Sequence, residues 1–179
     1  MLESLITSKT RIKLLMKFFI NSNTQSYLRN LESEFGDSTN AIRVELNRLE
    51  NANLLTSSVV GNKKIYQANK QHPLFGDIHS LLLKHMGLDQ LVEVVVKLGD
   101  VESAWITGDI AEGRNGKVID LVLIGKNFDK TYLVELVDKA EKLVGRHIRF
   151  MTVDPVKQDE FINDETSALQ IWGEEVDKR

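Results

Sequence analysis

One helical stretch has side chains of the types and spacing that recognise DNA bases. In the helix that begins after Asp37 or Ser38, either of which can cap it, one face presents four such positions: Asn40, Arg43, Val44 and Asn47. An arginine can fork onto guanine O6 and N7, an asparagine can pair with adenine N6 and N7, and an apolar side chain can meet a thymine methyl group. These residues predict base contacts in a major groove.

Four further residues at the edges of this stretch suit phosphate. Ser38 and Thr39 lie at the start of the helix, where hydroxyls and free backbone N–H groups can bind phosphate oxygens. Lys63 and Lys64 follow Gly61-Asn62, a pair typical of a tight turn with positive φ. Taken one at a time, these residues also fit an ordinary solvated surface. The combination of a polar helix face and a basic turn favours contact with DNA.

The elements that position these residues can be predicted from periodicity. Ile42, Leu46 and Leu49 have the spacing of one buried helix face, opposite the candidate base-reading residues. Two β-prone runs, 54–60 and 64–68, flank the Gly61 turn and predict a hairpin. Upstream, the pattern predicts helices over 7–20 and 26–35, the second ended by Gly36. Helices followed by a hairpin with a basic tip are the layout of a winged helix-turn-helix.

The second half of the chain predicts a small α/β unit. A helix over 74–86 has a broad apolar face, which we expect to pack on the first helix and form a dimer seam. The pattern then predicts a helix over 89–98, a strand over 101–107, a polar loop over 108–117 and a strand over 118–124. A helix over 130–144, a strand over 147–153 and one or two short helices over 156–176 follow. The expected fold class is α+β.

Composition narrows the function classes. Residues 1–72 hold 10 Lys and Arg against 6 Asp and Glu, a balance of +4, and residues 73–179 hold 13 against 20, a balance of −7. The basic part fits a local contact with a polyanion.

Without cysteine there is no disulfide or thiolate site, and no apolar run approaches the ~18 residues of a membrane span. We expect a cytoplasmic protein with no membrane partner. His72, His79 and His85 lack the i, i+4 spacing of helical metal ligands, so we expect no metal ion and no cofactor.

Residues 35–68, FGDSTNAIRVELNRLENANLLTSSVVGNKKIYQA, resemble the winged-helix regulators of the ArsR-like superfamily. Residues 69–89 resemble the helix that joins such a domain to a minimal nucleotidyltransferase-like domain, and ITGDIAEGRNGKVIDLVLIG, residues 106–125, resembles the signature of that domain. The resemblance covers roughly residues 7–165. It implies a winged helix domain over 1–72, a linker and dimerisation helix over 73–88, and a degenerate nucleotidyltransferase-like α/β domain with C-terminal helices over 89–179.

The resemblance also implies a vestigial nucleotide site at Gly108, Asp109 and Asp120. Active members hold the nucleotide phosphates in a Gly-Ser turn and Mg²⁺ between two carboxylates on the next strand. Here Asp109 replaces the serine, and valine occupies one of the two acid positions, Val118 or Val122 according to the alignment. One carboxylate cannot build a two-metal site. This domain is therefore expected to be catalytically inert.

The leading hypothesis is a homodimeric, sequence-specific transcriptional regulator of double-stranded DNA, whose second domain serves dimerisation or senses a nucleotide or other small-molecule effector. The alternative is an active Mg²⁺-dependent nucleotidyltransferase that uses an atypical acid set of Asp109, Asp120 and Asp154.

Overall fold

The computed structural model describes residues 2–163 and 166–174. It shows a mixed α/β protein in which the helices accompany two separate sheets. The chain divides into two compact units, Met1–His85 and Met86–Arg179. The division falls at the end of helix α5 (Phe75–Met86), which lies inside the predicted linker. The three predicted segments, 1–72, 73–88 and 89–179, stay a prediction.

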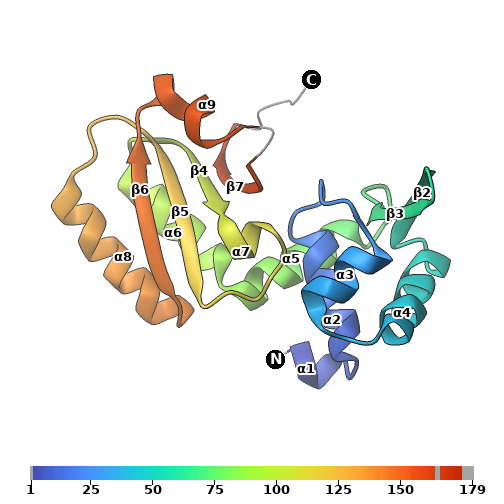
Figure 1. Ribbon diagram of the computed structural model, residues 1–179. Helices are drawn as coiled ribbons and strands as arrows, with labels where there is room; N and C mark the ends of the chain where they lie inside the picture. The colour runs from blue at the N-terminus through green and yellow to red at the C-terminus, as the bar shows by residue number, and fades with distance from the viewer. Residues whose placement is uncertain (1, 164–165, 175–179) are drawn as a thin grey trace. The chain divides into compact units, whose positions relative to one another are not determined.

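The first unit combines helices with a small antiparallel sheet (Figure 1). Its elements before α5 are, in order, α1 (Leu2–Leu5), α2 (Lys9–Phe19), β1 (Ser26–Tyr27), α3 (Leu28–Phe35), α4 (Thr39–Asn51), β2 (Leu55–Val60) and β3 (Lys63–Ala68). Strand β3 is central, with β1 and β2 antiparallel on its two sides. The predicted helices and hairpin are thereby confirmed. The four-residue α1 and the two-residue β1 were not predicted because they are too short to show periodicity.

The helix ends follow from local chemistry. Ser8 and Ser38 cap α2 and α4, each accepting a hydrogen bond at its hydroxyl from a backbone N–H three residues later. Gly36 ends α3 with φ +66°, a conformation that costs glycine little. Asp37, directly before Ser38, does not cap α4 but accepts hydrogen bonds from Thr10 and Lys13 of α2. The turn between α3 and α4 is therefore tied to α2.

The core of this unit lies between α2, α3 and α4. Fully buried side chains come from all three helices: Leu14, Phe18 and Phe19 of α2, Leu31 of α3, and Ile42 and Leu46 of α4. Helix α5 also packs on α2, as predicted, because the Phe75 ring lies 5.6 Å from the Phe19 ring and His79 Nδ1 lies 2.6 Å from the Phe19 carbonyl oxygen. In α3, Leu31 is buried, whereas Leu28 and Phe35 are half-buried.

The second unit is built on a four-stranded sheet. Its elements are α6 (Leu88–Leu98), β4 (Val101–Thr107), α7 (Gly108–Ala111), β5 (Val118–Gly125), α8 (Lys130–Val144), β6 (His147–Val153), the 3-10 turn η1 (Pro155–Lys157), α9 (Gln158–Phe161) and β7 (Ala168–Gly173). The strand order is β6-β5-β4-β7, with β5 parallel to β6 and the other pairs antiparallel. The predicted helices α6 and α8 and strands β4, β5 and β6 are confirmed.

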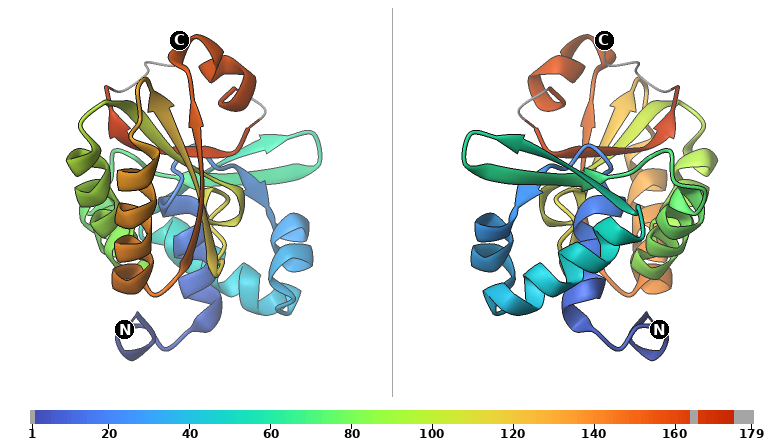
Figure 2. Two further views of the ribbon diagram at one scale, coloured as in Figure 1. Left: turned by 90° about the vertical axis from the view of Figure 1, so that its left-hand side faces the viewer. Right: turned by 90° about the vertical axis from the view of Figure 1, so that its right-hand side faces the viewer.

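The two faces of this sheet are covered by different helices. Figure 2 shows α6 and α8 on one face and α9 on the other, and α6 packs along α8. Alternation along β5 divides its apolar side chains between the faces. Val122 and Ile124 join Trp105, Val153 and Ile162 in a buried cluster. Because Ile162 directly follows α9, this cluster marks the face that α9 covers.

The prediction for the tail was wrong in part. Residues 155–161 are helical, but Leu169, Ile171 and Trp172 belong to strand β7, which pairs antiparallel with β4, Leu169 opposite Ile106. Without β7, the backbone N–H and C=O groups along one edge of β4 would have no hydrogen-bond partners. Pairing with residues 168–173 satisfies these groups, and this gain outweighs the helical preference of the local sequence. The predicted loop over 108–117 also begins with the single helical turn α7. Residues 164–165 and 175–176 of the predicted tail lie outside the described residues.

Among the described helices, none has both the length and the apolar character that crossing a bilayer requires.

Candidate nucleic-acid interface

Helix α4 has one buried face and one polar face. Ile42, Leu46 and Leu49 are buried, which confirms the predicted stripe. The opposite face is exposed, as expected from 100° per residue, and consists of Asn40, Arg43, Val44 and Asn47. Within the part of the chain that the structure describes, Arg43 has no ion pair or hydrogen bond through its side chain. Its five donors are therefore available to a ligand.

A buried carboxylate locks α4 onto α2. Glu45 is 5% exposed, and its Oε2 lies 2.8 Å from Arg11 Nε while its Oε1 lies 3.1 Å from Arg48 Nη1. Burial alone would raise the pKa of Glu45, but the hydrogen bonds from Arg11 and Ser8 and the charges of the two arginines outweigh burial and lower this pKa. Glu45 did not belong to the predicted stripe. Its position one turn before Leu49, on the edge of that stripe, was the only signal in the sequence.

The two residues predicted to bind phosphate at the start of α4 have different hydrogen-bond partners. Ser38 is exposed and its oxygen caps the helix by accepting the Ala41 N–H at 3.2 Å, which leaves the hydroxyl hydrogen free to donate. The Thr39 hydroxyl instead donates to Glu32 Oε1 at 2.6 Å. Ser38 is thus the better placed of the two to meet a phosphate oxygen.

The β2–β3 hairpin presents the two predicted lysines with different partners. Gly61 has φ +63° at the first position of the two-residue loop between Val60 and Lys63. Lys63 Nζ lies 4.4 Å from the centre of the Tyr27 ring, a cation–π contact with β1. Lys64 Nζ lies 2.7 Å from Glu50 Oε2, in the last turn of α4. Among the residues that the structure describes, Lys63 therefore has no carboxylate partner, whereas Lys64 is already paired.

Two further observations extend this surface. Tyr66 is buried, so its ring packs within the first unit. Arg29, in the first turn of α3, is exposed, and its side chain makes no hydrogen bond or ion pair in the described part of the chain. Sequence analysis missed Arg29 because it lies outside the predicted recognition helix, although the start of the preceding helix of a helix-turn-helix also borders the DNA backbone.

The second unit brings together only part of the predicted vestigial nucleotide site. Thr107 pairs with Asp120 across β4 and β5, and Gly108 follows with φ +67°. A Cβ at Gly108 would lie 2.7 Å from Asp120 Oδ2, so the glycine allows the carboxylate to approach the turn. Asp109 is exposed and points to Arg114, whose Nη2 lies 2.6 Å from its Oδ1.

The Asp120 carboxylate is occupied by an arginine. Arg149 Nε lies 2.7 Å from Oδ1 and Nη2 lies 2.9 Å from Oδ2, a two-point ion pair between β5 and β6. This hydrogen bonding raises the pKa of Arg149. Both residues line a hollow of about 180 Å³ with Thr107, Phe150 and Met151. A guanidinium thus stands where a metal cation would bind Asp120.

Asp154, the third acid of the alternative enzyme hypothesis, lies at the other end of the sheet. Asp120 pairs with Arg149 in β6, and Asp154 comes five residues after Arg149, which is about 16 Å along a strand. Its Oδ1 accepts the Val156 N–H and caps η1. Within residues 2–163 and 166–174, no three side chains of His, Asp or Glu gather closely enough to hold a metal ion.

No model of a protein family matches the chain, and no curated protein does. Two solved structures show a distant likeness. AF1382 from Archaeoglobus fulgidus is 13% identical, with a TM-score of 0.38 over 52% of this chain and 98% of that one. The C30AH42A mutant of ZitR from Lactococcus lactis is 18% identical, with a TM-score of 0.36 over 51% of this chain and 62% of that one.

Proposed function

We propose that the chain is a sequence-specific DNA-binding transcriptional regulator and that its first unit is a winged helix-turn-helix. The observation that supports this most is the free polar face of α4, where Asn40, Arg43 and Asn47 are exposed opposite a fully buried stripe. In this proposal α3 and α4 are the helix-turn-helix, α4 enters the major groove, and the β2–β3 hairpin is the wing.

Each part of the surface would have a separate task. Arg43, Asn40 and Asn47 would read base edges, and Val44 would meet a thymine methyl group. Ser38, Lys63 and Arg29 would bind phosphate, which sets register and affinity without specifying sequence. Glu45 fits this role indirectly, because its ion pairs with Arg11 and Arg48 hold α4 in one orientation. A regulator of this kind would act in the cytoplasm on double-stranded DNA.

We further propose a homodimer with an inert second unit. Helix α5 uses Phe75 and His79 to contact α2, while Leu74, directly before α5, and Leu81 within it are 53% and 37% exposed. These side chains would meet a second copy and place two α4 helices in successive major grooves. In the second unit, the resemblance to a nucleotidyltransferase-like domain stays part of the proposal, and the pairing of Asp120 with Arg149 supports the absence of metal-dependent catalysis there.

Selection of bound sequences from random DNA tests the proposal. We expect a (pseudo)palindromic consensus whose affinity falls steeply with salt. Arg43→Ala should cost about 1–3 kcal/mol against the consensus and relax preference at one position of each half-site. Arg43→Lys is the matched control, since it keeps the charge and loses the guanidinium fork.

The proposal fails if no sequence is enriched, or if Arg43→Ala and the double variant Lys63→Ala/Lys64→Ala bind the enriched sequence as tightly as the natural protein does. Retention of full specificity by Arg43→Lys would instead assign Arg43 to a phosphate.

A further inference from the structure

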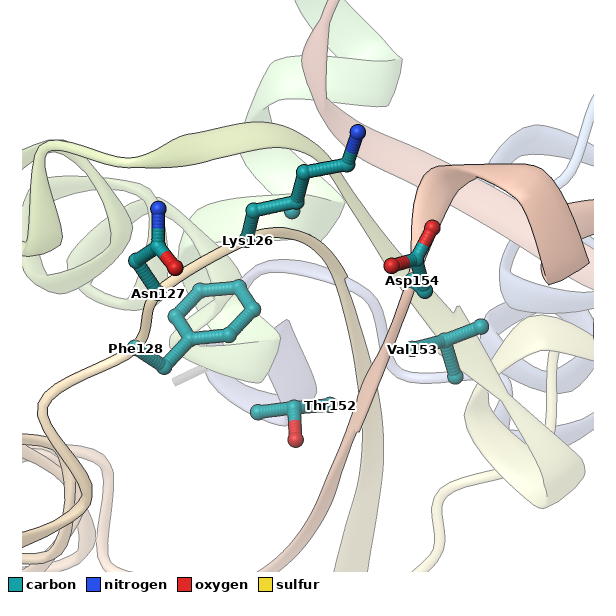
Figure 3. A pocket seen from close by; sticks show the side chains of 7 residues that line it. Lys126, Asn127, Phe128, Thr152, Val153 and Asp154 are labelled. Carbon is teal, nitrogen blue, oxygen red and sulfur yellow. The ribbon is translucent and has the colours of Figure 1, made fainter.

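The second unit has a groove at the end of the sheet opposite to Asp120. One hollow, of about 260 Å³, is lined by residues 125–128 and 152–154 (Figure 3). A second, of about 570 Å³, is lined by residues 152–154 together with Val156, Lys157 and Phe161. Because both include Thr152, Val153 and Asp154, the two hollows adjoin at the end of β6, and together they are called the groove. The larger hollow is in the size range of small-molecule sites.

The position of the groove is one where α/β sheets bind ligands. Strands β5 and β6 are adjacent and parallel, and both end at the groove, at Gly125 and Val153. The chain leaves β5 for α8 on one face of the sheet and leaves β6 for α9 on the other (Figure 2). Where neighbouring parallel strands send their connections to opposite faces, a crevice forms outside their carboxyl ends. The topology therefore creates this groove.

The floor of the groove is apolar. Val153 is buried at its centre, the Phe128 ring is half-buried, and Phe161 is 39% exposed. In Figure 3 the Phe128 ring lies between Asn127 and Thr152. Gly125 is required here, since a Cβ at this position would collide with the Asp100 carbonyl oxygen and approach the Phe128 ring to 2.9 Å. An aromatic or aliphatic group could thus pack against this floor.

The rim of the groove carries unpaired positive charge. Lys126 and Lys157 are both exposed, and neither has a hydrogen bond or ion pair in the part of the chain that the structure describes. The one acid in the lining, Asp154, accepts the Val156 N–H at 3.0 Å through Oδ1, so the lining carries two positive charges against one negative charge. Asn127, held at φ +58°, and Thr152 add an amide and a hydroxyl. The polar groups therefore favour an anion.

We propose that this groove binds a small organic anion, a carboxylate or phosphate ester with an aromatic or aliphatic body. The anion would contact Lys126 and Lys157, and the body would pack on Phe128, Val153 and Phe161. The site is separate from the hollow at Asp120, because the two lie at opposite ends of β5 and β6. Binding does not depend on the proposed role in DNA recognition, so either proposal can fail alone.

Titration of the ¹⁵N-labelled full chain, followed by amide NMR, tests the site with four probes of similar size. Phenyl phosphate and phenylacetate are the anions, benzyl alcohol is neutral and 2-phenylethylamine is a cation. We expect saturable shifts with at least one anion, confined to residues 125–128, 152–157 and 161, and weaker or no shifts with the other two probes. The stronger anion distinguishes a phosphate site from a carboxylate site.

Lys126→Gln/Lys157→Gln should weaken anion binding at least about tenfold, because the charge-assisted contacts are lost. The matched control is Lys117→Gln/Lys142→Gln, which removes two exposed lysines of the same unit outside the groove and should leave binding unchanged. Amide shifts elsewhere in the sheet report whether each variant is folded. The proposal is overturned by absence of saturable shifts with both anions, by shifts centred on Asp120 and Arg149, by equal binding of the amine, or by unchanged binding in Lys126→Gln/Lys157→Gln.

Discussion

Lys64 Nζ lies 2.7 Å from Glu50 Oε2, an ion pair that ties strand β3 of the hairpin to the last turn of α4. The Ser57 hydroxyl donates to the other oxygen of the same carboxylate at 2.5 Å. The hydrogen bonds from Lys64 and Ser57 lower the pKa of Glu50, and the same pair raises the pKa of Lys64. Glu50 thus holds the hairpin against α4 and at the same time neutralises one of the two lysines predicted to bind phosphate.

This pairing predicts unequal roles for the adjacent lysines. Lys63→Ala should lower the slope of log affinity against log salt by about 0.9, the loss of one phosphate contact, whereas Lys64→Ala should lower it by less. Glu50→Gln releases Lys64 and should tighten DNA binding at low salt. The measurement is binding to the selected DNA over a salt series.

Glu135→Gln removes one negative charge from an exposed position of α8, outside the helix proposed to form the dimer, and is the control for Glu50→Gln. If both variants tighten binding equally, net charge explains the effect and the pairing does not. Folding should tolerate Glu50→Gln, since a partly exposed ion pair contributes less than about 1 kcal/mol.

Acid should destabilise the first unit through Asp37 and Glu45. Hydrogen bonds from Lys13 and Thr10 lower the pKa of Asp37, and Arg11 lowers that of Glu45 against its burial. A carboxyl whose folded pKa is depressed contributes stability above its ordinary value, 3.8 for Asp and 4.5 for Glu, and loses it as pH falls through the folded pKa. Urea titrations at a series of pH values, followed by amide signals of α2 and α4, should show a decline that begins below about pH 4.5.

Glu45→Gln should lower the free energy of unfolding at neutral pH by about 2 kcal/mol, because it leaves Arg11 without its buried counter-ion. It should also flatten the acid dependence. Asp77→Asn serves as the control, since Asp77 has no hydrogen bond or ion pair among the residues that the structure describes. An equally flattened profile in that variant would contradict the assignment to Glu45.

Substitution of two glycines of the first unit distinguishes the effect of backbone strain on stability from the effect of side-chain packing. A Cβ at Gly36 or at Gly76 meets no atom within 4 Å, but Gly36 has φ +66° and Gly76 lies in helix α5 with an ordinary φ. Gly36→Ala should therefore destabilise the unit by about 1 kcal/mol, while Gly76→Ala should stabilise it by about 0.5 kcal/mol. Urea unfolding of both variants measures the difference, and the same sign of change in both would refute this explanation.

Asp120 and Arg149 provide the test for the enzyme alternative. Because the guanidinium occupies both carboxylate oxygens, we expect no transfer from any of the four labelled nucleoside triphosphates in the presence of Mg²⁺ or Mn²⁺. Labelled product that Asp120→Asn abolishes would establish a nucleotidyltransferase. Product formed only by Arg149→Ala would show that the ion pair itself blocks the site.

Local chemistry explains why much of the first unit could be predicted. The stripe of Ile42, Leu46 and Leu49, the Ser38 cap, the Gly36 end and the Gly61 turn each depend on residues within a few positions of one another. The exposed face with Arg43 follows from the same periodicity. For such features the sequence holds the whole cause, because helix and turn geometry relates near neighbours directly.

Tertiary structure decided which partner each functional side chain has. Lys64 pairs with a residue 14 positions away, Arg149 with one 29 positions away and Glu45 with one 34 positions away. Residues 168–173 likewise form strand β7 by pairing with β4, although their local pattern favoured a helix. Sequence alone determined which residues face outward on α4. Only the folded chain could show which charges are already paired, and that β5 and β6 end side by side at the groove. Both features depend on contacts between segments far apart in sequence, and no repeating pattern in the sequence predicts such contacts.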